Sequence, residues 1–533
     1  MNMGKVLERT AARFPDRTAI VDPDTAVRYT YEDWNKRVAG LAASLDDHGV
    51  QPGDRVGAIL RTRVETATLY WATQRVGATF VPYNTRSAAD ELSFLVNNSR
   101  PKLLFFSAIG EDAVTEARST FEETDTFVYV DDETPASALA YDEFLDASTT
   151  SYPSYENDPD DVSIILHTSG TTGMPKGVPR THTNTYAATT AHIIQTEMAD
   201  NETTLGLMPV YHTMGLRILT ASAMLGGKWV AQRSFDAEQT LSLIEDEQIT
   251  SLYLVPTVYH GLIESNQLEH TDLSHTNKLA YAGTPMTEPV QQEVLDRFEP
   301  DVFVNHFGST EVYTYSVCPW IAEKPGCAGR AGINTEVRVV EPDRSGTVSP
   351  NRTVEQGETG EVIVDATSPE AFSGYLNRPD ADAESFEDGW YFTGDLGYFD
   401  EDGDLFVTGR VDDMIISGGE NIYPIEVEDV LEAHDAVSES AVVGLEHERW
   451  NQVVTSFVKL ADIDETTHDY EALAEALDAF AVDSPNLANY KRPRKYIFVG
   501  EIPKSTVGKT LKSKLRAEDI EDVTDDIYAD IDL

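Results

Sequence analysis

The sequence predicts an α/β protein with a large N-terminal domain and a small, mobile α+β C-terminal domain. Near the N-terminus short apolar runs alternate with amphipathic helical stretches, in the order 55–60, 64–76 and 78–81. That alternation is typical of a sheet with helices on its faces. The length of 533 residues exceeds what one hydrophobic core needs, so two or more domains are expected.

The remaining stretches support this organisation in chain order. Residues 1–20 predict an amphipathic helix and not a signal peptide, because they contain no apolar h-region. Residues 121–161 are acidic and predict a surface connection between two α/β subdomains, the second of which covers 163–307. Residues 326–406 change to short alternating runs punctuated by Gly, Pro and Asp, which predicts a β-rich third subdomain. From 414 onward the pattern predicts a smaller βαβ-like unit.

These changes of pattern predict the domain boundaries. The N-terminal domain is expected to cover 1–411 and the C-terminal domain 412–515. The remaining residues, 516–533, form a densely acidic tail that is expected to fray or lie on the surface.

The composition is strongly acidic. Its 40 basic and 92 acidic residues give a formal net charge of -52, which argues against nucleic-acid partners and anionic membranes. Such a charge destabilises a compact state unless salt screens it. We therefore expect a halophile, with a haloarchaeon as the expected source; an acidic protein of a mesophile is the alternative.

No run of 18 apolar residues is present, so no membrane insertion is expected. Cys318 and Cys327 are read as incidental thiols in a reducing, cytoplasmic compartment.

One segment, His167–Val178 with the sequence HTSGTTGMPKGV, indicates phosphate binding. It follows an apolar run and combines glycines, hydroxyl side chains and a single lysine. Glycines let backbone N–H groups approach an anion, and hydroxyls and lysine add donors. A polar surface loop is the alternative interpretation. The segment is not a Walker A loop, and Gly508-Lys509-Thr510 does not complete one, because position 503 is Pro.

This segment resembles the phosphate loop of the acyl-adenylate-forming (AMP-binding) superfamily. Further motifs of that superfamily follow in its order: Asn305–Glu311, Gly374–Pro379, Tyr391–Asp395, Gly409–Asp413 and Pro503–Lys509. The resemblance covers nearly the whole chain, from about Val6 to Leu515. The run from Gly409 to Pro424 and the segment Tyr490–Pro493 are most similar to the acyl- and aryl-CoA synthetase branch, including benzoate-type CoA ligases.

The resemblance implies an ATP-dependent acid–CoA ligase. Such an enzyme converts a carboxylic acid to acyl-AMP with release of pyrophosphate, then transfers the acyl group to coenzyme A. The implied ligands are ATP, Mg²⁺, coenzyme A and a small aryl or medium-length acyl carboxylic acid. The resemblance leaves open whether the protein forms a homodimer. Two alternatives stay open: an adenylation enzyme that loads a carrier-protein thiol, and a non-catalytic acyl-nucleotide sensor. Metalloprotease, α/β-hydrolase and Rossmann motifs are absent from the sequence.

The resemblance also assigns residues to ATP. Glu311 is expected to contact Mg²⁺ and Thr310 the α-phosphate. Phe307 stands where the family usually has tyrosine, and its ring can still stack on adenine. Asp395 and Arg410 are expected to bind the ribose. The β- and γ-phosphates are expected to be bound by Thr168, Ser169, Gly170, Thr171, Thr172, Gly173 and Lys176.

Lys509 is expected to be the catalytic lysine that bridges the carboxylate and the α-phosphate, because lysine offers a compact charge on a flexible stem. Composition alone does not separate it from the neighbouring lysines 504, 512 and 514; the Pro503–Lys509 pattern does. Asp412 matches the hinge about which the small domain rotates between the two half-reactions. The loop containing Gly418, Gly419 and Glu420 is then expected to enter the site for the second step.

The remaining assignments concern the acid and coenzyme A. His212 is expected beside the acyl carboxylate and the pantetheine channel, as a catalytic residue. Arg86, Trp450 and Arg494 match positions that meet the nucleotide end of coenzyme A. The acyl pocket is expected to be lined by Tyr211, His212, Tyr253, Ala282, Gly283, Thr284, His306 and Val312. Aromatic faces with polar tips favour an aryl or hydroxyaryl acid over a long alkyl chain.

Overall fold

The chain forms two compact units. The computed structural model describes residues 2–145, 155–168, 174–343, 347–417, 420–447, 449–461, 469–484, 487–504, 510–516 and 527–532. The first unit comprises Met1–Val337 and Val364–Tyr391, and the second comprises Arg338–Ile363 and Phe392–Leu533. The predicted domain boundary at Asp412 stays a prediction.

The first unit contains a seven-stranded sheet in the order β7-β6-β5-β3-β4-β8-β9. All its pairings are parallel except the one between β8 and β9, which is antiparallel. Its parallel strands are almost wholly apolar, as expected for strands buried on both faces. The strands are β3 (Arg55–Ile59), β4 (Thr79–Pro82), β5 (Leu103–Phe106), β6 (Thr126–Tyr129), β7 (Leu139–Ala140), β8 (Val162–Thr168) and β9 (Lys176–Thr181). The helices that follow its strands are α3 (Val64–Arg75), α4 (Ala89–Ser99), α5 (Ala108–Ala117) and α6 (Tyr141–Phe144).

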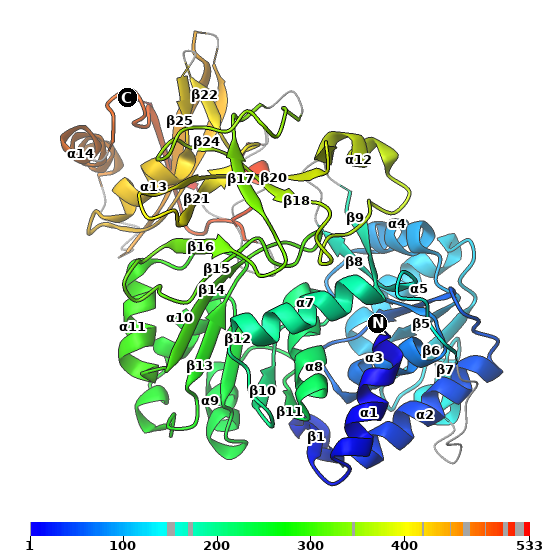
Figure 1. Cartoon of the computed structure of the whole chain (residues 1–533). Helices are drawn as coiled ribbons and strands as arrows, with labels where there is room; N and C mark the ends of the chain where they lie inside the picture. Colours follow the sequence, from blue (N-terminus) through cyan, green and yellow to red (C-terminus); the bar gives the residue numbers. More distant parts are fainter. Residues whose placement is uncertain are drawn as a thin grey trace. The chain divides into compact units, whose positions relative to one another are not determined.

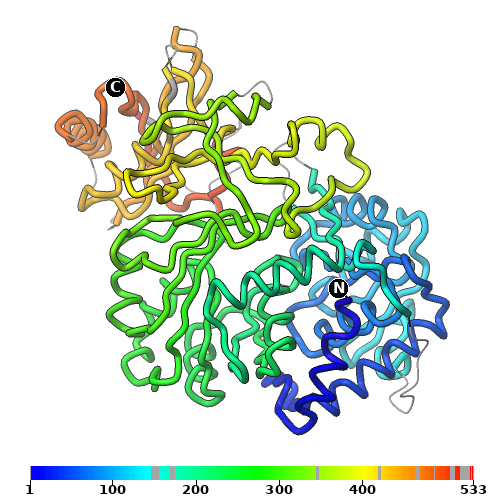
Figure 2. Tube along the Cα trace, viewed as in Figure 1, coloured from blue at the N-terminus to red at the C-terminus, as the bar shows by residue number. Residues whose placement is uncertain are grey.

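A second sheet of the first unit runs in the order β16-β15-β14-β13-β12-β10-β11-β1-β2. Its strands are β1 (Thr18–Asp22), β2 (Val27–Thr30), β10 (Thr203–Gly206), β11 (Lys228–Ala231), β12 (Ser251–Leu254), β13 (Lys278–Tyr281), β14 (Val302–Phe307), β15 (Ser316–Cys318) and β16 (Cys327–Ala331). Figures 1 and 2 show the dark-blue β1 beside β11, so the N-terminal segment completes a sheet formed much later in the chain. Around it lie α1 (Val6–Arg13), α2 (Tyr31–Asp47), α9 (Ala237–Asp246), α10 (Pro256–Ile263) and α11 (Glu288–Phe298).

Two helices connect the sheets of the first unit (Figure 1). Helix α7 (His182–Gln195) contacts β8 and β9 of the seven-stranded sheet, whereas α8 (Thr213–Leu225) contacts β10 and β11 of the second sheet. The two helices also pack on each other. A capping box of Thr181 and Asn184 begins α7 immediately after β9, which satisfies backbone N–H groups of its first turn. Most side chains of α7 and α8 are buried.

The second unit is β-rich at its start. Strands β17 (Val337–Val340), β18 (Gly360–Asp365), β20 (Trp390–Phe399) and β21 (Leu405–Arg410) lie in that spatial order. The short helix α12 (Pro379–Ser385) and strand β19 (Phe386–Glu387) precede β20 and belong to the first unit. The β-rich character predicted for 326–406 is confirmed, but its residues are divided between the two units.

A six-stranded sheet follows in the second unit, in the order β23-β22-β25-β26-β27, with β24 paired to β25. Helices α13 and α14 contribute Val427, Leu431 and Leu477 to the hydrophobic cluster that also contains β-strand residues Val458 and Phe498. The elements are β22 (Ile415–Ser417), β23 (Glu420–Ile422), α13 (Pro424–Glu432), β24 (Val437–His447), β25 (Asn451–Leu460), α14 (Tyr470–Asp483), β26 (Lys495–Val499), α15 (Lys512–Leu515) and β27 (Ile527–Asp532).

Two sequence predictions about connecting segments are wrong. The stretch 121–161 is not merely a surface connection, because β6 joins the seven-stranded sheet and Tyr141 and Phe144 are buried. The end of the tail does not fray, because β27 pairs with β26. The predicted N-terminal helix is confirmed for α1 and the short 3₁₀-helix before it, but β1 begins at Thr18. Within the described ranges, no helix combines the length and apolarity required to cross a bilayer.

Candidate active site

The two strands that flank the phosphate-loop motif form an antiparallel pair. Thr168 at the end of β8 lies opposite Lys176 at the start of β9. Both ends of the motif thus lie on paired strands, and its central residues Ser169, Gly170, Thr171, Thr172 and Gly173 lie outside the described residues. The Lys176 ammonium lies 4.8 Å from the centre of the Tyr375 ring, a cation–π distance.

Tyr375 connects this lysine to Glu311. Its hydroxyl donates to Oε1 of Glu311 at 2.9 Å and lies 3.2 Å from the hydroxyl of Tyr391. Burial and the nearby charge of Glu311 raise the pKa of Tyr375, so the phenol keeps its proton and stays a donor. The structure thus brings together Lys176 and Glu311, which the sequence assigned to phosphate and metal. Tyr375 belongs to the motif Gly374–Pro379, and its place in that motif is the sequence signal for a role in the site.

Glu311 sits at the end of a tight turn that follows β14. The Ser309 hydroxyl accepts from the backbone N–H groups of Glu311 and Val312, at 3.1 and 3.3 Å. Gly308 is required here, because a Cβ atom on it would lie 1.8 Å from the carbonyl oxygen of Tyr313. Phe307, the last residue of β14, packs edge-on against Tyr315 with ring centres 5.0 Å apart.

A fully buried arginine supports this turn from β9. The Arg180 guanidinium donates to the carbonyl oxygens of Thr310 (2.5 Å), Glu311 (3.2 Å) and Glu370 (2.7 Å). Three main-chain acceptors on two separate segments are thereby bound by one side chain. Sequence reasoning gave Arg180 no role, because nothing in the motif Lys176–Thr181 marks an arginine that points into the interior.

Two predicted residues of the acyl pocket lie in one buried polar cluster. The Tyr253 hydroxyl is 3.1 Å from Nδ1 of His306, and Nε2 of His306 is 3.2 Å from the Thr314 hydroxyl. The Tyr313 hydroxyl lies 3.3 Å from that of Tyr253 and 3.0 Å from Nδ1 of His192. Burial lowers the pKa of His306 to about 4, so this imidazole is neutral at pH 7.

The other predicted pocket residues are more dispersed. His212 occupies the N-cap position of α8 without a side-chain capping bond, and its ring centre lies 4.7 Å from that of Tyr211. Ala282, Gly283 and Thr284 form the segment after β13. Val312 is fully buried in a hydrophobic cluster with Val178, Tyr315 and Phe372. Arg86, predicted to meet coenzyme A, is exposed and contributes to the electrostatic environment of Tyr211.

The predicted ribose residues of the second unit contact each other. Arg410 Nη1 lies 2.6 Å from Oδ1 of Asp395, and also donates to the carbonyl oxygen of Thr393. Beside them the buried carboxylate of Glu361 accepts from the backbone N–H of Gly394 at 3.1 Å. Burial, with further contributions from the charges of Asp395 and Asp412, raises the pKa of Glu361 to about 7. The predicted hinge residue, Asp412, is exposed in the turn that follows β21.

Glu361 should make stability depend on pH near neutrality. Its folded-state pKa of about 7 exceeds its ordinary value of 4.5, so the folded chain binds more protons than the unfolded chain between these values. Stability should therefore fall as pH rises from about 4.5 to 7. Between pH 5 and pH 8 we expect Glu361 to lower the free energy of unfolding of the wild type by about 2–3 kcal/mol. Glu361→Gln should lack this contribution, and urea unfolding at the two pH values measures the difference. The exposed Glu401→Gln serves as the control; an identical pH dependence of Glu361→Gln and the wild type would contradict the prediction.

Of the residues assigned to the second half-reaction, Trp450, Arg494 and Glu420 lie in the second unit, whereas Arg86 and His212 lie in the first. Trp450 stacks on His447 with ring centres 4.6 Å apart, and the Arg494 side chain donates to nearby carbonyl oxygens. Glu420 begins β23 and pairs with Ser417. Gly418 and Gly419 lie outside the described residues.

Lys509 also lies outside the described residues, but the chain on either side of it is described. Lys504 and Thr510 form an antiparallel bridge, and the Leu511 N–H donates to the carbonyl oxygen of Pro503. Two of the three neighbouring lysines form ion pairs: Lys504 with Glu439 at 2.9 Å, and Lys512 with Glu428 at 2.6 Å. These pairs favour Lys509 over Lys504 and Lys512 as the lysine that serves catalysis.

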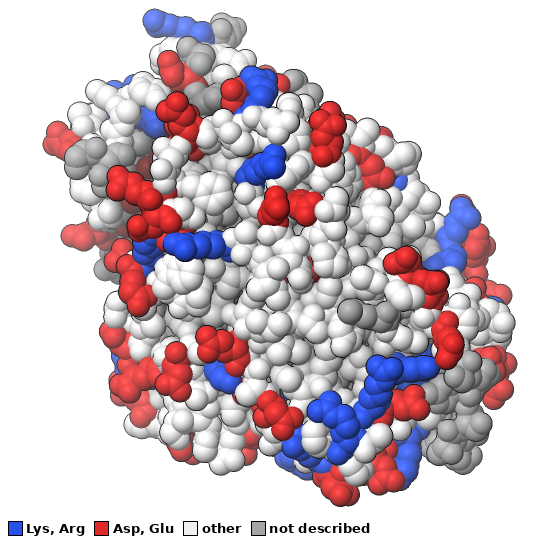
Figure 3. Space-filling model, in the orientation of Figure 1, with Lys and Arg blue, Asp and Glu red and all other residues white. Residues whose placement is uncertain are grey.

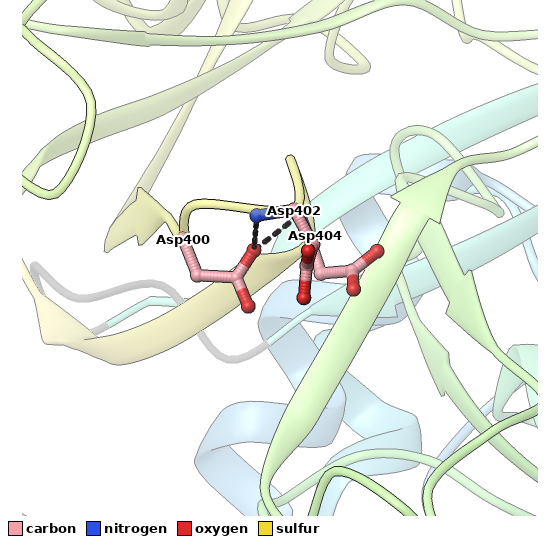
Figure 4. A group of neighbouring side chains, drawn as sticks. All are labelled: Asp400, Asp402 and Asp404. Atoms are coloured by element: carbon pink, nitrogen blue, oxygen red, sulfur yellow. Dashed lines mark hydrogen bonds between the residues drawn. The ribbon is translucent and has the colours of Figure 1, made fainter.

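An acidic turn joins β20 to β21 (Figure 4). Asp400, Asp402 and Asp404 each present a carboxylate oxygen within 4.8 Å of the others. The Asp400 carboxylate accepts from the backbone N–H groups of Asp402 and Asp404, at 3.0 and 2.8 Å. Asp400 thus closes the hairpin turn, which accounts for its position without a metal ion.

Comparison with known proteins identifies the family. Residues 7–376 match the AMP-binding enzyme family, and residues 426–509 match the AMP-binding enzyme C-terminal domain. The chain belongs to the AMP-binding enzyme family. This AMP-binding enzyme is 32% identical over 517 residues to the 4-chlorobenzoate–CoA ligase of an Arthrobacter species, covering 95% of this chain and 93% of that ligase. It is 33% identical over 521 residues to the long-chain-fatty-acid–CoA ligase FadD13 of Mycobacterium tuberculosis, covering 97% and 98% of the two chains.

Solved structures agree with this assignment. ATP-bound MatB from Rhodopseudomonas palustris superposes with a TM-score of 0.84 at 27% identity, covering 97% of this chain and 98% of that one. The curated relatives are CoA ligases, and this supports the ligase interpretation of the AMP-binding enzyme over a carrier-protein adenylation enzyme or a sensor. The predicted α/β class, with a large N-terminal and a small C-terminal domain, is confirmed.

Proposed function

We propose that this AMP-binding enzyme is an ATP-dependent acid–CoA ligase whose first step takes place around Lys176, Tyr375 and Glu311. The observation that carries the proposal is the contiguity of these three side chains, since a phosphate-binding lysine and a metal-binding carboxylate must act on the same triphosphate. Tyr375 fixes the Glu311 carboxylate and lies beneath the Lys176 ammonium. The match to CoA ligases along nearly the whole chain supports the same reaction.

In the first step the acid's carboxylate oxygen attacks the α-phosphate of ATP, and pyrophosphate leaves. Both reactants are anions, so the barrier is lowered mainly by positioning and by positive charge. Thr310 and Lys509 would act at the α-phosphate, Asp395 and Arg410 at the ribose, and Phe307 at the adenine. The phosphate-loop residues from Thr168 to Lys176 would bind the β- and γ-phosphates.

Mg²⁺ fits this arrangement of residues. Glu311 offers a hard carboxylate oxygen, and the triphosphate supplies further oxygens, a combination typical of Mg²⁺ sites. When bound, the ion would neutralise charge on the phosphates. Tyr375 holds the carboxylate in place by its hydrogen bond to Oε1.

In the second step the thiol of coenzyme A displaces AMP from the acyl-adenylate. We propose that rotation about Asp412 brings the Gly418–Glu420 loop to the acyl group and withdraws Lys509. His212 would lie beside the acyl carboxylate, and Trp450, Arg494 and Arg86 would contact the nucleotide end of coenzyme A. One site can then serve two reactions with different space requirements.

Two assays test the ligase proposal. ATP–pyrophosphate exchange with a panel of carboxylic acids reports the first step, and acyl-CoA formation with coenzyme A reports the second. We expect exchange with at least one acid and thioester formation with coenzyme A. Exchange without thioester formation would instead favour a carrier-protein acceptor, and no exchange with any acid would overturn the proposal.

We propose further that the protein works in a salty cytoplasm. Its net charge is -52, and Figure 3 shows Asp and Glu side chains at many places on the visible face, mostly away from its centre. Both cysteines are free and buried, which favours a reducing compartment.

Salt should stabilise this enzyme. The Debye length is about 10 Å at 0.1 M ionic strength and about 3 Å at 1 M, so neighbouring carboxylates stop repelling one another only near molar salt. We expect melting temperature and activity to rise together between about 0.1 and 2 M potassium chloride. Differential scanning calorimetry and the exchange assay check this across the range. A melting temperature that stays flat or falls would refute the halophilic adaptation and leave the ligase proposal intact.

A further inference from the structure

The buried polar cluster at the acyl pocket contains a cation without a close counter-ion. Arg217, on the second turn of α8, is fully buried. Its Nη1 donates to the Thr185 carbonyl oxygen at 2.6 Å and to the Thr189 hydroxyl at 2.9 Å. Its Nε and Nη2 atoms have no hydrogen-bond partner among the described residues.

Other polar atoms of the same region are also unpartnered. Nε2 of His192 and the hydroxyl of Tyr70 are buried without a hydrogen bond to any described residue. The Arg217 guanidinium lies 5.3 Å from the centre of the Tyr313 ring, and Tyr313 is hydrogen-bonded to His192 and to Tyr253. Its charge also acts on Tyr70. Buried polar groups without partners are rare in proteins, so several in one region require an explanation.

No carboxylate pairs directly with Arg217. Among the described residues, none of the ion pairs closer than 4.0 Å involves this guanidinium. The carboxylate of Glu370 contributes to its electrostatic environment from farther away, and is bonded to Asn334 at 2.9 Å. Arg180, a second buried cation, also interacts with Glu370. A buried water molecule could satisfy the free donors but not the charge, whereas an anion satisfies both.

We propose that the acid activated by this enzyme carries a second carboxylate, which Arg217 binds within the cluster formed by Tyr253, His306 and Tyr313. This inference rests on the proposed ligase function and on the placement of the reacting carboxylate near His212. His212 is the N-cap residue of α8, and Arg217 lies in the second turn of the same helix. The expected substrate class is therefore a dicarboxylic acid, for which a rigid benzene dicarboxylate is the test compound. Arg217 is the specificity-determining residue.

The test uses two acids of nearly equal shape. Terephthalate carries the second carboxylate, and 4-carbamoylbenzoate replaces it with a neutral amide. With the wild-type enzyme we expect kcat/KM for ATP–pyrophosphate exchange to be at least about 10²-fold higher for terephthalate, since a site that leaves buried donors unpaired discriminates strongly. An equal or lower value for terephthalate would overturn the inference, including the case in which only acids with a single carboxylate react.

Two variants assign the preference to Arg217. Arg217→Met should abolish the preference for terephthalate while changing exchange with 4-carbamoylbenzoate by less than about tenfold. Arg217→Lys, which keeps the charge, should retain part of the preference and remains informative if the methionine variant does not fold. A preference that survives in Arg217→Met would overturn the assignment to Arg217. If no acid supports exchange with the wild type, the ligase proposal itself fails, and this inference fails with it.

Discussion

Replacing Lys509 by alanine is expected to reduce acyl-adenylate formation by about 10²–10³-fold, which corresponds to about 3–4 kcal/mol of lost transition-state stabilisation. The physical reason is the loss of a movable positive charge at the α-phosphate, where two anions must meet. Thioester formation from supplied acyl-AMP should stay nearly unchanged, because that half-reaction does not involve attack on ATP. Single-turnover measurement of each half-reaction separates the two effects.

Lys504→Ala is the matched control for this prediction. Lys504 lies on the same segment but is paired with Glu439 at 2.9 Å, so its removal should leave both half-reactions within a few-fold of the wild type. Equal losses of the two half-reactions in Lys509→Ala would remove Lys509 from the catalytic role. A larger loss in Lys504→Ala than in Lys509→Ala would transfer that role to Lys504.

Arg180→Met should damage both stability and adenylation. The substitution leaves the buried carbonyl oxygens of Thr310, Glu311 and Glu370 without the donor that binds them. Each unsatisfied buried acceptor costs about 1–3 kcal/mol, partly offset by no longer burying a charge, so a net loss of about 3–5 kcal/mol is expected. Because the turn that carries Glu311 loses its support, the exchange rate should fall by about 10²-fold. Thermal unfolding and exchange kinetics measure the two effects.

The half-exposed Arg297→Met provides the comparison for Arg180, because its ion pairs with Glu269 and Glu293 lie at the surface. It should change stability by less than about 1 kcal/mol. A purely structural role of Arg180 would lower the melting temperature without raising KM for ATP at a temperature where the variant is folded. The positioning role predicts a higher KM under the same conditions.

The fold could be predicted well where the chain shows strong periodicity. The apolar runs at 55–60 and 78–81 and the helix between them correspond to β3, β4 and α3 within one residue or so. The prediction was wrong where a short strand stands in acidic surroundings, as β6 does, because its partner β5 is specified only by tertiary packing. It was wrong again at β27, where Ile527, Ala529 and Ile531 recur at the two-residue period of a strand within a segment whose acidic composition is typical of a solvated tail.

Those residues of the candidate site that stand in recognisable sequence motifs could be predicted. Lys176 and Glu311 stand in motifs, and the structure places both around Tyr375. Arg180 and Arg217 could not be predicted, because an isolated arginine in a strand or helix looks like a surface residue in sequence. Arg217 is buried because α8 packs on α7, and Arg180 because the segments that carry Glu311 and Glu370 cover β9; the local sequence specifies neither arrangement. The roles of the predicted site residues stay predictions.

The pairing of β27 with β26 has a practical consequence for the end of the chain. Residues 527–532 supply the edge of the six-stranded sheet, and Ala529 and Ile531 pack against its hydrophobic cluster. Shortening the protein before Ile527 would uncover the backbone N–H and C=O groups of β26, whose last four residues are buried. An uncovered edge of that kind recruits strands from other molecules. Residues 527–532 are therefore expected to protect the unit that contains Lys509, the proposed catalytic lysine, from self-association.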